Sequence, residues 1–184
     1  MSTDSDRFFV LTGGPGSGKT TLIEALRDSG HVSSVEAGRG IIQQHMAISG
    51  PVLPWNDPAL FAETMLSWEM RSHAIARDED GIVFFDRGVP DIAGYLKLSG
   101  LPVPAHVGKA AEIFRYNRKV FVLPPWPEIF TQDAERRQDL DEARRTFEAV
   151  SHAYEACGYE LVAVPPASVE ERRRFVLAEV GAST

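Results

Sequence analysis

The sequence contains a single cysteine, Cys157, which excludes an internal disulfide bond. No hydrophobic run approaches the roughly 18 residues that a membrane-spanning helix requires. The first ten residues, MSTDSDRFFV, have neither the basic segment nor the long apolar segment of a signal peptide. Together these features predict a cytoplasmic protein that acts away from the membrane.

Positive charge is also scarce, with 19 Lys and Arg residues against 26 Asp and Glu residues and a formal net charge of -7. Proteins that bind the phosphate backbone of nucleic acids need an excess of Lys and Arg, so this balance argues against a general nucleic-acid-binding protein. The five histidines show no paired spacing typical of zinc sites, and we expect no structural metal. An anionic ligand must therefore be held by a local site.

The length of 184 residues, with 43% hydrophobic and 24% charged residues, is typical of one globular domain spanning 1–184. Five short apolar runs are continuous rather than alternating, which predicts buried parallel strands. Amphipathic stretches of helical length fill the gaps between the runs. We expect strands at 8–12, 32–36, 82–86, 119–123 and 159–164, and helices at 19–28, 39–48, 58–77, 90–98, 139–157 and 169–179. This alternation predicts a doubly wound α/β fold.

The segment GGPGSGKT matches the pattern G-x-x-x-x-G-K-[ST] in full, directly after a predicted strand and directly before a predicted helix. Its glycines let the backbone curl so that successive N–H groups can point at phosphate oxygens. Lys19 adds a point charge, and the Thr20 hydroxyl is placed to ligate magnesium. A turn that binds nothing needs neither residue. The predicted nucleotide-binding residues are Gly13, Gly14, Pro15, Gly16, Ser17, Gly18, Lys19, Thr20 and Thr21.

The next chemical signal is Asp86, which directly follows the apolar run Ile82-Val83-Phe84-Phe85. A hydrophobic strand that ends in aspartate is typical of the Walker B segment, whose carboxylate holds magnesium directly or through water. The alternative is that Asp86 caps the next helix. Combined with the phosphate loop, the pattern favours Asp86 and Thr20 as magnesium ligands and ATP with Mg²⁺ as cofactors.

Four segments, GGPGSGKTT, VEAGRG, FFDRG and VLPPWPEIFTQDAERRQ, resemble a family of P-loop ATPases grouped with the nicotinamide-riboside-kinase module. The resemblance covers nearly the whole chain, although only the phosphate loop is specific to a chemistry. It implies a nucleotide-kinase-like, three-layer P-loop fold. Such a fold has a five-stranded parallel sheet in the order 2-3-1-4-5 and a lid that carries arginine.

The resemblance also implies an acceptor site. In the wider nucleoside-kinase group, the second strand ends in a carboxylate that contacts the acceptor and the third ends in an acid-Arg pair; Glu36 and Asp86-Arg87 lie at those places. Glu36 is predicted to orient an acceptor hydroxyl and take its proton, and Arg39 to pair with Glu36 or contact an anionic acceptor. The alternative is that Glu36 only caps the following helix and pairs with Arg39. Gly88 follows the pair in place of a serine familiar in deoxynucleoside kinases, which argues against a deoxynucleoside substrate.

A lid is expected from Glu128 to Asp139, after four residues, Pro124-Pro125-Trp126-Pro127, that end the fourth strand. Within it, Arg136 and Arg137 are candidates to neutralise charge on the moving phosphoryl group. The alternative is that both face water and pair with nearby acids. Solvent exposure is the favoured interpretation for the arginines of two later helices: Arg144, Arg145, Arg172, Arg173 and Arg174.

Two functions follow from these features. The first is a kinase that transfers the γ-phosphoryl group of Mg-ATP to a small-molecule acceptor, with Lys19, Glu36, Asp86, Arg136 and Arg137 as catalytic residues and Glu36, Arg39 and Arg87 binding the acceptor. The second is a regulatory ATPase that controls a partner protein. A guanine-specific switch is disfavoured because no [NT]-K-x-D segment follows the fourth strand. A hexameric motor is disfavoured because the chain leaves no room for a helical lid domain.

Overall fold

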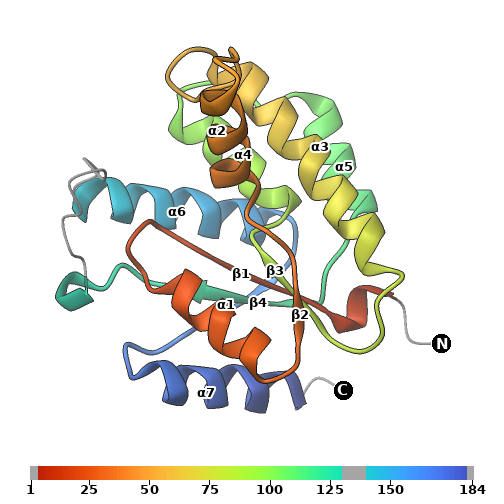
Figure 1. The fold of residues 1–184 in the computed structure, drawn as a ribbon, viewed down its shortest axis with the longest axis vertical. Helices are drawn as coiled ribbons and strands as arrows, with labels where there is room; N and C mark the ends of the chain where they lie inside the picture. Colours follow the sequence, from red (N-terminus) through yellow and green to blue (C-terminus); the bar gives the residue numbers. More distant parts are fainter. Residues whose placement is uncertain (1–3, 130–139, 182–184) are drawn as a thin grey trace.

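A parallel five-stranded sheet in the order β2-β3-β1-β4-β5 forms the centre of the molecule (Figure 1). The structure is a computed structural model that describes residues 4–129 and 140–181. The strands are β1 (Phe8–Gly13), β2 (Val32–Ser33), β3 (Val83–Asp86), β4 (Lys119–Leu123) and β5 (Glu160–Ala163). The predicted fold class and strand order are confirmed.

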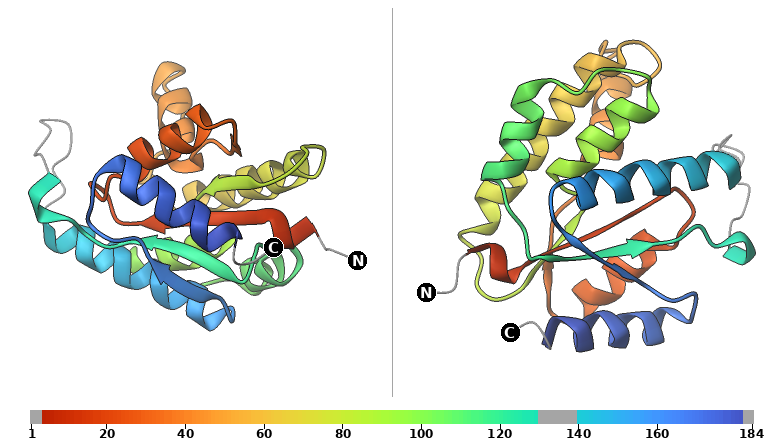
Figure 2. Two further views of the ribbon diagram at one scale, coloured as in Figure 1. Left: turned by 90° about the horizontal axis from the view of Figure 1, so that it is seen from below. Right: turned by 180° about the vertical axis from the view of Figure 1, so that it is seen from behind.

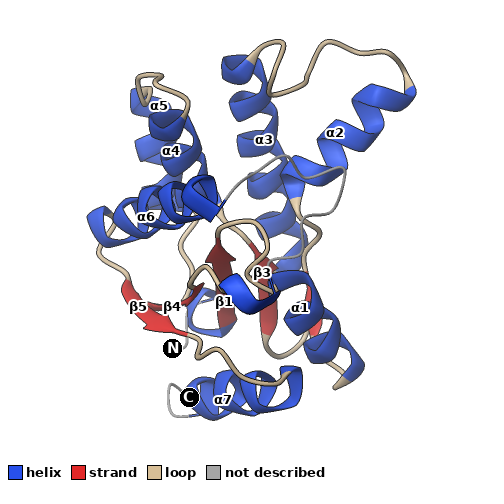
Figure 3. Ribbon diagram, turned by 90° about the vertical axis from the view of Figure 1, so that its left-hand side faces the viewer, coloured by secondary structure: helices blue, strands red, loops and turns tan. Residues whose placement is uncertain are grey.

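Helices cover both faces of this sheet and make a three-layer molecule (Figure 2). One face carries α1 (Lys19–Asp28) and α7 (Val169–Gly181). The other carries α3 (Pro58–Ala76), α4 (Val89–Leu98), α5 (Ala105–Ile113) and α6 (Leu140–Ala156). Helix α2 (Ala37–Ala47) packs against α3 (Figure 3), and short 3-10 turns lie at Asp4–Arg7 and Pro127–Ile129. Within the described residues, no helix is both long and apolar enough to cross a membrane.

The central strand β1 shows why the sequences of the strands are continuous apolar runs. Successive side chains on a strand point to opposite faces. Phe8 and Val10 accordingly join the core beneath α3 to α6, whereas Phe9 and Leu11 join the core beneath α1 and α7. All four side chains are fully buried. Because helices cover both faces, neither set of positions along β1 needs to be polar.

The edges of the sheet differ from the prediction of five buried strands. β2 and β5 each have one neighbouring strand and are only partly buried. β2 is shorter than predicted, although Ser34 still donates its N–H to the carbonyl of Phe84 at 2.9 Å. The chain then leaves the sheet, and α2 begins at Ala37, two residues before the predicted start at Arg39.

Helix α5 was not predicted. Its sequence, AHVGKAAEI, places Gly108 in the middle, and glycine lowers helix propensity by roughly 1 kcal/mol relative to alanine. Its buried residues, Val107, Ala110 and Ala111, join the core beneath α4 and α6. Tertiary packing therefore outweighs local propensity in this segment.

Candidate functional site

The loop between β1 and α1 has a backbone that requires glycine. Gly16 and Gly18 have φ values of 71° and 75°, in the left-handed region that side chains disfavour. Gly14 is required for space, since a Cβ there would lie 2.4 Å from the carbonyl oxygen of Ala143 on α6. The predicted loop thus packs tightly against the covering helix while keeping its curled conformation.

This loop presents unpaired main-chain donors. Within the described residues, no main-chain carbonyl accepts a hydrogen bond from the N–H groups of residues 16–20. Gly18 is the N-cap of α1, so these donors coincide with the positive end of the helix dipole. An array of free N–H groups at a helix N-terminus is suited to binding phosphate.

The two charged residues of the donor site lie in contact. Lys19 is the first residue of α1 and is 6% exposed, and its Nζ donates to Oδ1 of Asp86 at the end of β3. The register of β1 and β3 pairs Leu11 with Asp86, which brings the carboxylate beside the loop. The N-cap of α4 is Gly88, so Asp86 does not occupy the helix-capping position of the alternative interpretation.

The oxygen atoms near the loop suit a magnesium ion better than a permanently bound metal centre. Thr20 is exposed in the first turn of α1, and Asp86 supplies one carboxylate. In the part of the chain that the structure describes, no three His, Cys, Asp or Glu side chains form a metal-binding group. Magnesium typically takes one or two protein ligands, keeps several waters and binds substrate phosphates. This donor set is therefore compatible with magnesium that arrives with a nucleotide.

Glu36 lies at the N-cap of α2, beyond the end of β2, and its side chain makes no capping hydrogen bond. Its carboxylate lies 3.4 Å from Nε of Arg87 and 4.0 Å from Nε of Arg39. Burial alone would raise the pKa of Glu36, but the positive charges of Arg87, Lys19 and Arg39 outweigh burial and lower it. Since Lys19 contributes to this shift, the carboxylate and the phosphate loop share one electrostatic environment.

Arg87 has a backbone conformation that is rare for a side-chain-bearing residue. Its φ is 73°, and its N–H donates to the carbonyl of Leu11 at 3.0 Å. The guanidinium lies between Glu36 and Asp91, at 3.4 Å and 3.2 Å. Burial disfavours its charged form, yet Asp91, Glu36 and Asp86 together raise its pKa. Left-handed backbone in a non-glycine residue costs energy and is concentrated at functional sites.

Asp91 is a residue of this network that sequence reasoning missed. It lies in the first turn of α4 and is 6% exposed. Its carboxylate accepts hydrogen bonds from the Thr12 hydroxyl, Nη1 of Arg87, the N–H of Gly88 at 2.9 Å and the Tyr154 hydroxyl at 2.6 Å. A signal existed in the sequence, because an acid in the first turn of a helix is a common partner for the N-cap N–H.

Arg172 contradicts the prediction of a solvent-exposed side chain. It is 3% exposed, and its guanidinium donates to the carbonyls of Ser17 at 3.0 Å and Gly18 at 3.3 Å. The ring centroid of Trp126 lies 5.7 Å from its Cζ. The neighbouring Arg173, by contrast, pairs with an acid on the outer face of α7.

A cavity of about 430 Å³ lies beside the phosphate loop. Its walls come from the loop, from the segment after β4 and from the segment after β5, and they include Ser17, Trp126, Pro165, Pro166 and Arg172. A second cavity of about 660 Å³ lies between β2, α2 and α3 and is lined by no residue of the phosphate loop. The smaller cavity is therefore the one that adjoins the candidate phosphate site.

Comparison with known proteins agrees with this geometry. Residues 8–172 match a family described as AAA domain. The chain belongs to this AAA domain family. None of the curated proteins compared with the sequence matches it. Together with the intact phosphate loop, family membership confirms the prediction of an ATP-binding P-loop protein.

Several solved structures share the fold of this AAA domain. Deoxyadenosine kinase from M. mycoides, with products dCMP and a flexible dCDP bound, has a TM-score of 0.65 and 10% identity over 95% of this chain and 99% of that chain. The NadR protein in complex with NR has a TM-score of 0.67 and 20% identity over 97% of this chain and 50% of that chain. The present chain therefore spans about half the length of the NadR chain. Thymidylate kinase from Ehrlichia chaffeensis has a TM-score of 0.64 and 12% identity over 94% of this chain and 97% of that chain. At these identities the likeness establishes the fold.

The structure explains why glycine follows the acid-Arg pair in this AAA domain. Gly88 has extended backbone, so its conformation does not demand glycine. A Cβ at this position, however, would lie 2.9 Å from Cε2 of Tyr116 and 3.0 Å from the hydroxyl of Tyr154. A serine would therefore displace the two tyrosines that support Asp91 and the start of α4.

Glu69 is a second acid that sequence reasoning missed. It lies on α3, is 2% exposed, and its Oε2 has no hydrogen-bond partner within the described residues. Burial, followed by the negative charges of Asp91 and Asp86, raises its pKa well above the ordinary value. No pattern in the helix sequence distinguishes it from an exposed glutamate. The structure thus places a buried carboxyl group with a raised pKa close to the charged network.

The two arginines of the predicted lid, Arg136 and Arg137, lie outside the described residues. Their assignment stays a prediction.

Proposed function

We propose that this AAA domain is a kinase that transfers the γ-phosphoryl group of Mg-ATP to a small-molecule acceptor. The observation that carries this proposal is the shared environment of the two half-sites. Lys19 contacts Asp86 on the phosphate-loop side and also lowers the pKa of Glu36 on the opposite side. In open α/β sheets, ligands bind beyond the carboxyl ends of the strands, which is where these residues lie.

Donor binding would use the main chain and one cation. The N–H groups of residues 16–20 would donate hydrogen bonds to the phosphate oxygens, and Lys19 would add a charge-assisted hydrogen bond. Contact with Asp86 holds the ammonium beside the loop. Thr20 and Asp86 would hold Mg²⁺, which neutralises charge on the phosphates when bound. The nucleoside portion has room in the cavity of about 430 Å³ beside Ser17.

Transfer would use Glu36 to orient the acceptor. The acceptor hydroxyl oxygen forms a bond to the γ-phosphorus, the bond from that phosphorus to the β-bridging oxygen breaks, and ADP leaves with the electron pair. The hydroxyl proton passes to the carboxylate of Glu36, which its low pKa keeps ionised at neutral pH. A weakly basic carboxylate suffices, because the transition state of phosphoryl transfer is loose and the protein has little covalent chemistry to perform.

Two further arginines would contact the acceptor. Arg87 is held between Glu36 and Asp91, so its guanidinium has a fixed position at the crevice. Arg39 has half of its side chain exposed and lies 4.0 Å from Glu36, which leaves it free to meet an anionic group. Arg136 and Arg137 would complete the site as lid residues over the transferring phosphoryl group. Location in the cytoplasm stays a prediction.

The test is a screen for an acceptor. Wild-type protein with Mg-ATP is incubated with nucleosides, nucleotides, pyridine ribosides and other small metabolites, and ADP release is measured above the basal rate. We expect one chemical class to raise ADP release and to yield a phosphorylated product by mass spectrometry. If none does, and a protein partner instead stimulates hydrolysis, the regulatory ATPase replaces the kinase.

A further inference from the structure

Arg172 is a buried cation that has no acidic partner in the part of the chain that the structure describes. Within the described residues it forms no salt bridge, and burial lowers its pKa with no carboxylate to offset the effect. Its Nη1 and Nη2 instead donate to the carbonyls of Gly18 and Ser17, and its Nε is buried without an acceptor. The partners of this charge are therefore the peptide groups of the phosphate loop.

The peptide groups concerned carry the donors that phosphate would use. The carbonyl of Ser17 shares its peptide unit with the N–H of Gly18, and the carbonyl of Gly18 shares its peptide unit with the N–H of Lys19. Both N–H groups belong to the unpaired array of residues 16–20. A cation on the carbonyl side of a peptide unit polarises that unit and strengthens its N–H as a donor. The same contacts fix the orientation of both units before a ligand arrives.

We propose that Arg172 is a positioning residue that holds and polarises the Ser17–Gly18 and Gly18–Lys19 peptide units for phosphate binding. This inference rests on the proposed binding of donor phosphates at the loop. Arg172 comes from α7, a helix that packs against α1, and its side chain lies between the phosphate loop and the cavity of about 430 Å³. Trp126, which lines the neighbouring cavity, packs near the same guanidinium and restricts its position.

The adjacent Arg173 provides a matched control on the same helix. It also carries a guanidinium, but it donates to Glu170 and to the Ser29 hydroxyl on the exposed surface. Removing Arg173 changes the net charge of the protein by the same amount as removing Arg172. A difference between the two variants therefore reports the contacts with the loop and not the overall charge.

Isothermal titration calorimetry with Mg-ATP and with magnesium tripolyphosphate tests the proposal, because tripolyphosphate has no nucleoside. We expect Arg172→Ala to weaken both ligands by a similar factor, about tenfold or more, and Arg173→Ala to leave both unchanged. Unchanged tripolyphosphate affinity in folded Arg172→Ala would overturn the proposal, whether or not ATP affinity falls. If wild-type protein binds neither ligand, the proposed function fails and this inference fails with it.

Two conservative variants keep the test decisive if Arg172→Ala does not fold. Arg172→Lys retains the positive charge, whereas Arg172→Gln retains a donor without the charge. Polarisation of the loop predicts that Arg172→Lys binds tripolyphosphate more tightly than Arg172→Gln, with both weaker than wild type. Equal affinities for the two variants would overturn the proposal, because they would show that the charge of residue 172 does not reach the phosphate ligand.

Discussion

The donor and acceptor sides of the crevice are built in different ways. The donor side is one short stretch of chain, residues 13–20, in which the N–H groups of residues 16–20 have no main-chain acceptor within the described residues. Its Lys19 forms a buried ion pair with Asp86. The acceptor side is assembled from separate segments, and its members are charged side chains that hold one another in place: Glu36, Arg87 and Asp91. A change on the donor side should therefore stay local, whereas a change on the acceptor side should spread into the fold.

The largest effect on stability should come from Asp91. Asp91→Ala removes an acceptor shared by four donors and leaves the partly buried Arg87 without one of its two acidic partners. Breaking a buried ion pair from one side typically costs about 3–5 kcal/mol, and we expect a loss of that size in the free energy of unfolding measured with urea. Asp141→Ala, at an exposed pair with Arg144, should cost less than about 1 kcal/mol. Equal, small losses in both variants would show that the acceptor network does not support the fold.

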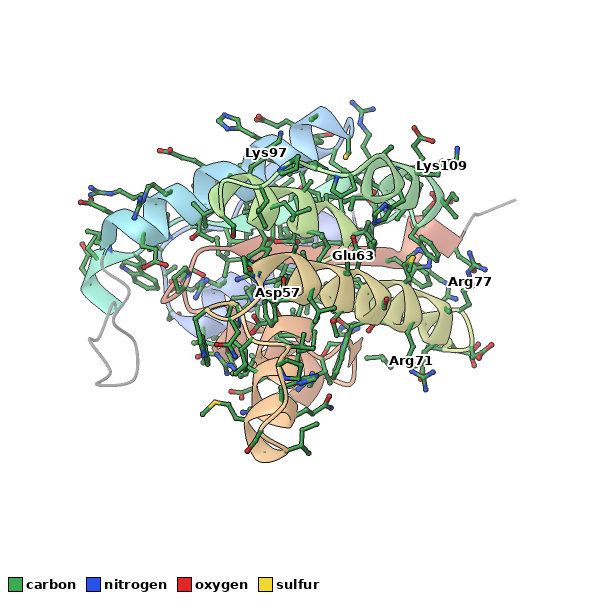
Figure 4. All side chains as sticks on the ribbon, turned by 90° about the horizontal axis from the view of Figure 1, so that it is seen from above. Asp57, Glu63, Arg71, Arg77, Lys97 and Lys109 are labelled. Atoms are coloured by element: carbon green, nitrogen blue, oxygen red, sulfur yellow. The ribbon has the colours of Figure 1, made fainter. Side chains whose placement is uncertain are left out.

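The donor side is tested by Lys19→Ala. Charge-assisted hydrogen bonds contribute roughly 1.5–3 kcal/mol, so we expect Mg-ATP affinity to fall by about a hundredfold in calorimetry. Binding of an acceptor identified by the screen should change much less. Lys109→Ala is the control, because Lys109, labelled in Figure 4, is exposed on α5 and pairs with Glu112. Unchanged ATP affinity in folded Lys19→Ala would show that the loop does not bind ATP.

A smaller effect, dependent on pH, is expected at Glu69. In the folded protein its pKa is raised above the ordinary 4.5, so above that pH the folded state holds a proton that the unfolded chain releases. Stability should therefore fall as pH rises from 4.5 toward the raised pKa, by up to about 1.4 kcal/mol per pH unit. Glu69→Gln stays neutral, and we expect it to match wild type near pH 4 and to be more stable by on the order of 1 kcal/mol at pH 7.

The matched control for Glu69→Gln is Glu63→Gln on the same helix. Glu63, labelled in Figure 4, has about half of its side chain exposed, and its carboxylate lies 2.7 Å from Nε2 of His106 on α5. We expect this variant to show the wild-type dependence of stability on pH in thermal unfolding. If Glu69→Gln also follows the wild-type curve at every pH, Glu69 is ionised in the folded protein and has a counterion.

The donor side could be predicted from sequence because its signal is contiguous. The loop pattern, the preceding strand and the following helix are all encoded in residues 8–28, and the meeting of Lys19 with Asp86 follows once β1 and β3 are neighbours. Alternation of apolar runs with amphipathic stretches likewise suffices for the class of sheet. Local patterns of this kind do not depend on how distant segments pack.

The remaining site residues depend on packing between distant segments. Arg172 belongs to a run of three arginines, a pattern typical of a solvent-exposed helix face, and contacts a loop about 154 residues away only because α7 packs against α1. Glu69 is one polar residue in a helix, and its burial depends on the core beneath α3. Neither position carries a spacing or a motif that marks it, so tertiary structure was needed to find both.

The central claim is that one crevice joins a donor half and an acceptor half, and Glu36→Gln tests it most directly. This change removes the proton acceptor while keeping the shape of the side chain, which makes no capping hydrogen bond that could be lost. With the acceptor that the screen identifies, we expect the rate of phosphoryl transfer to fall by about a hundredfold, a typical contribution of a general base, while the Mg-ATP dissociation constant stays unchanged. An unchanged transfer rate would contradict the account, because the acceptor would then be phosphorylated without the acid that links the two halves.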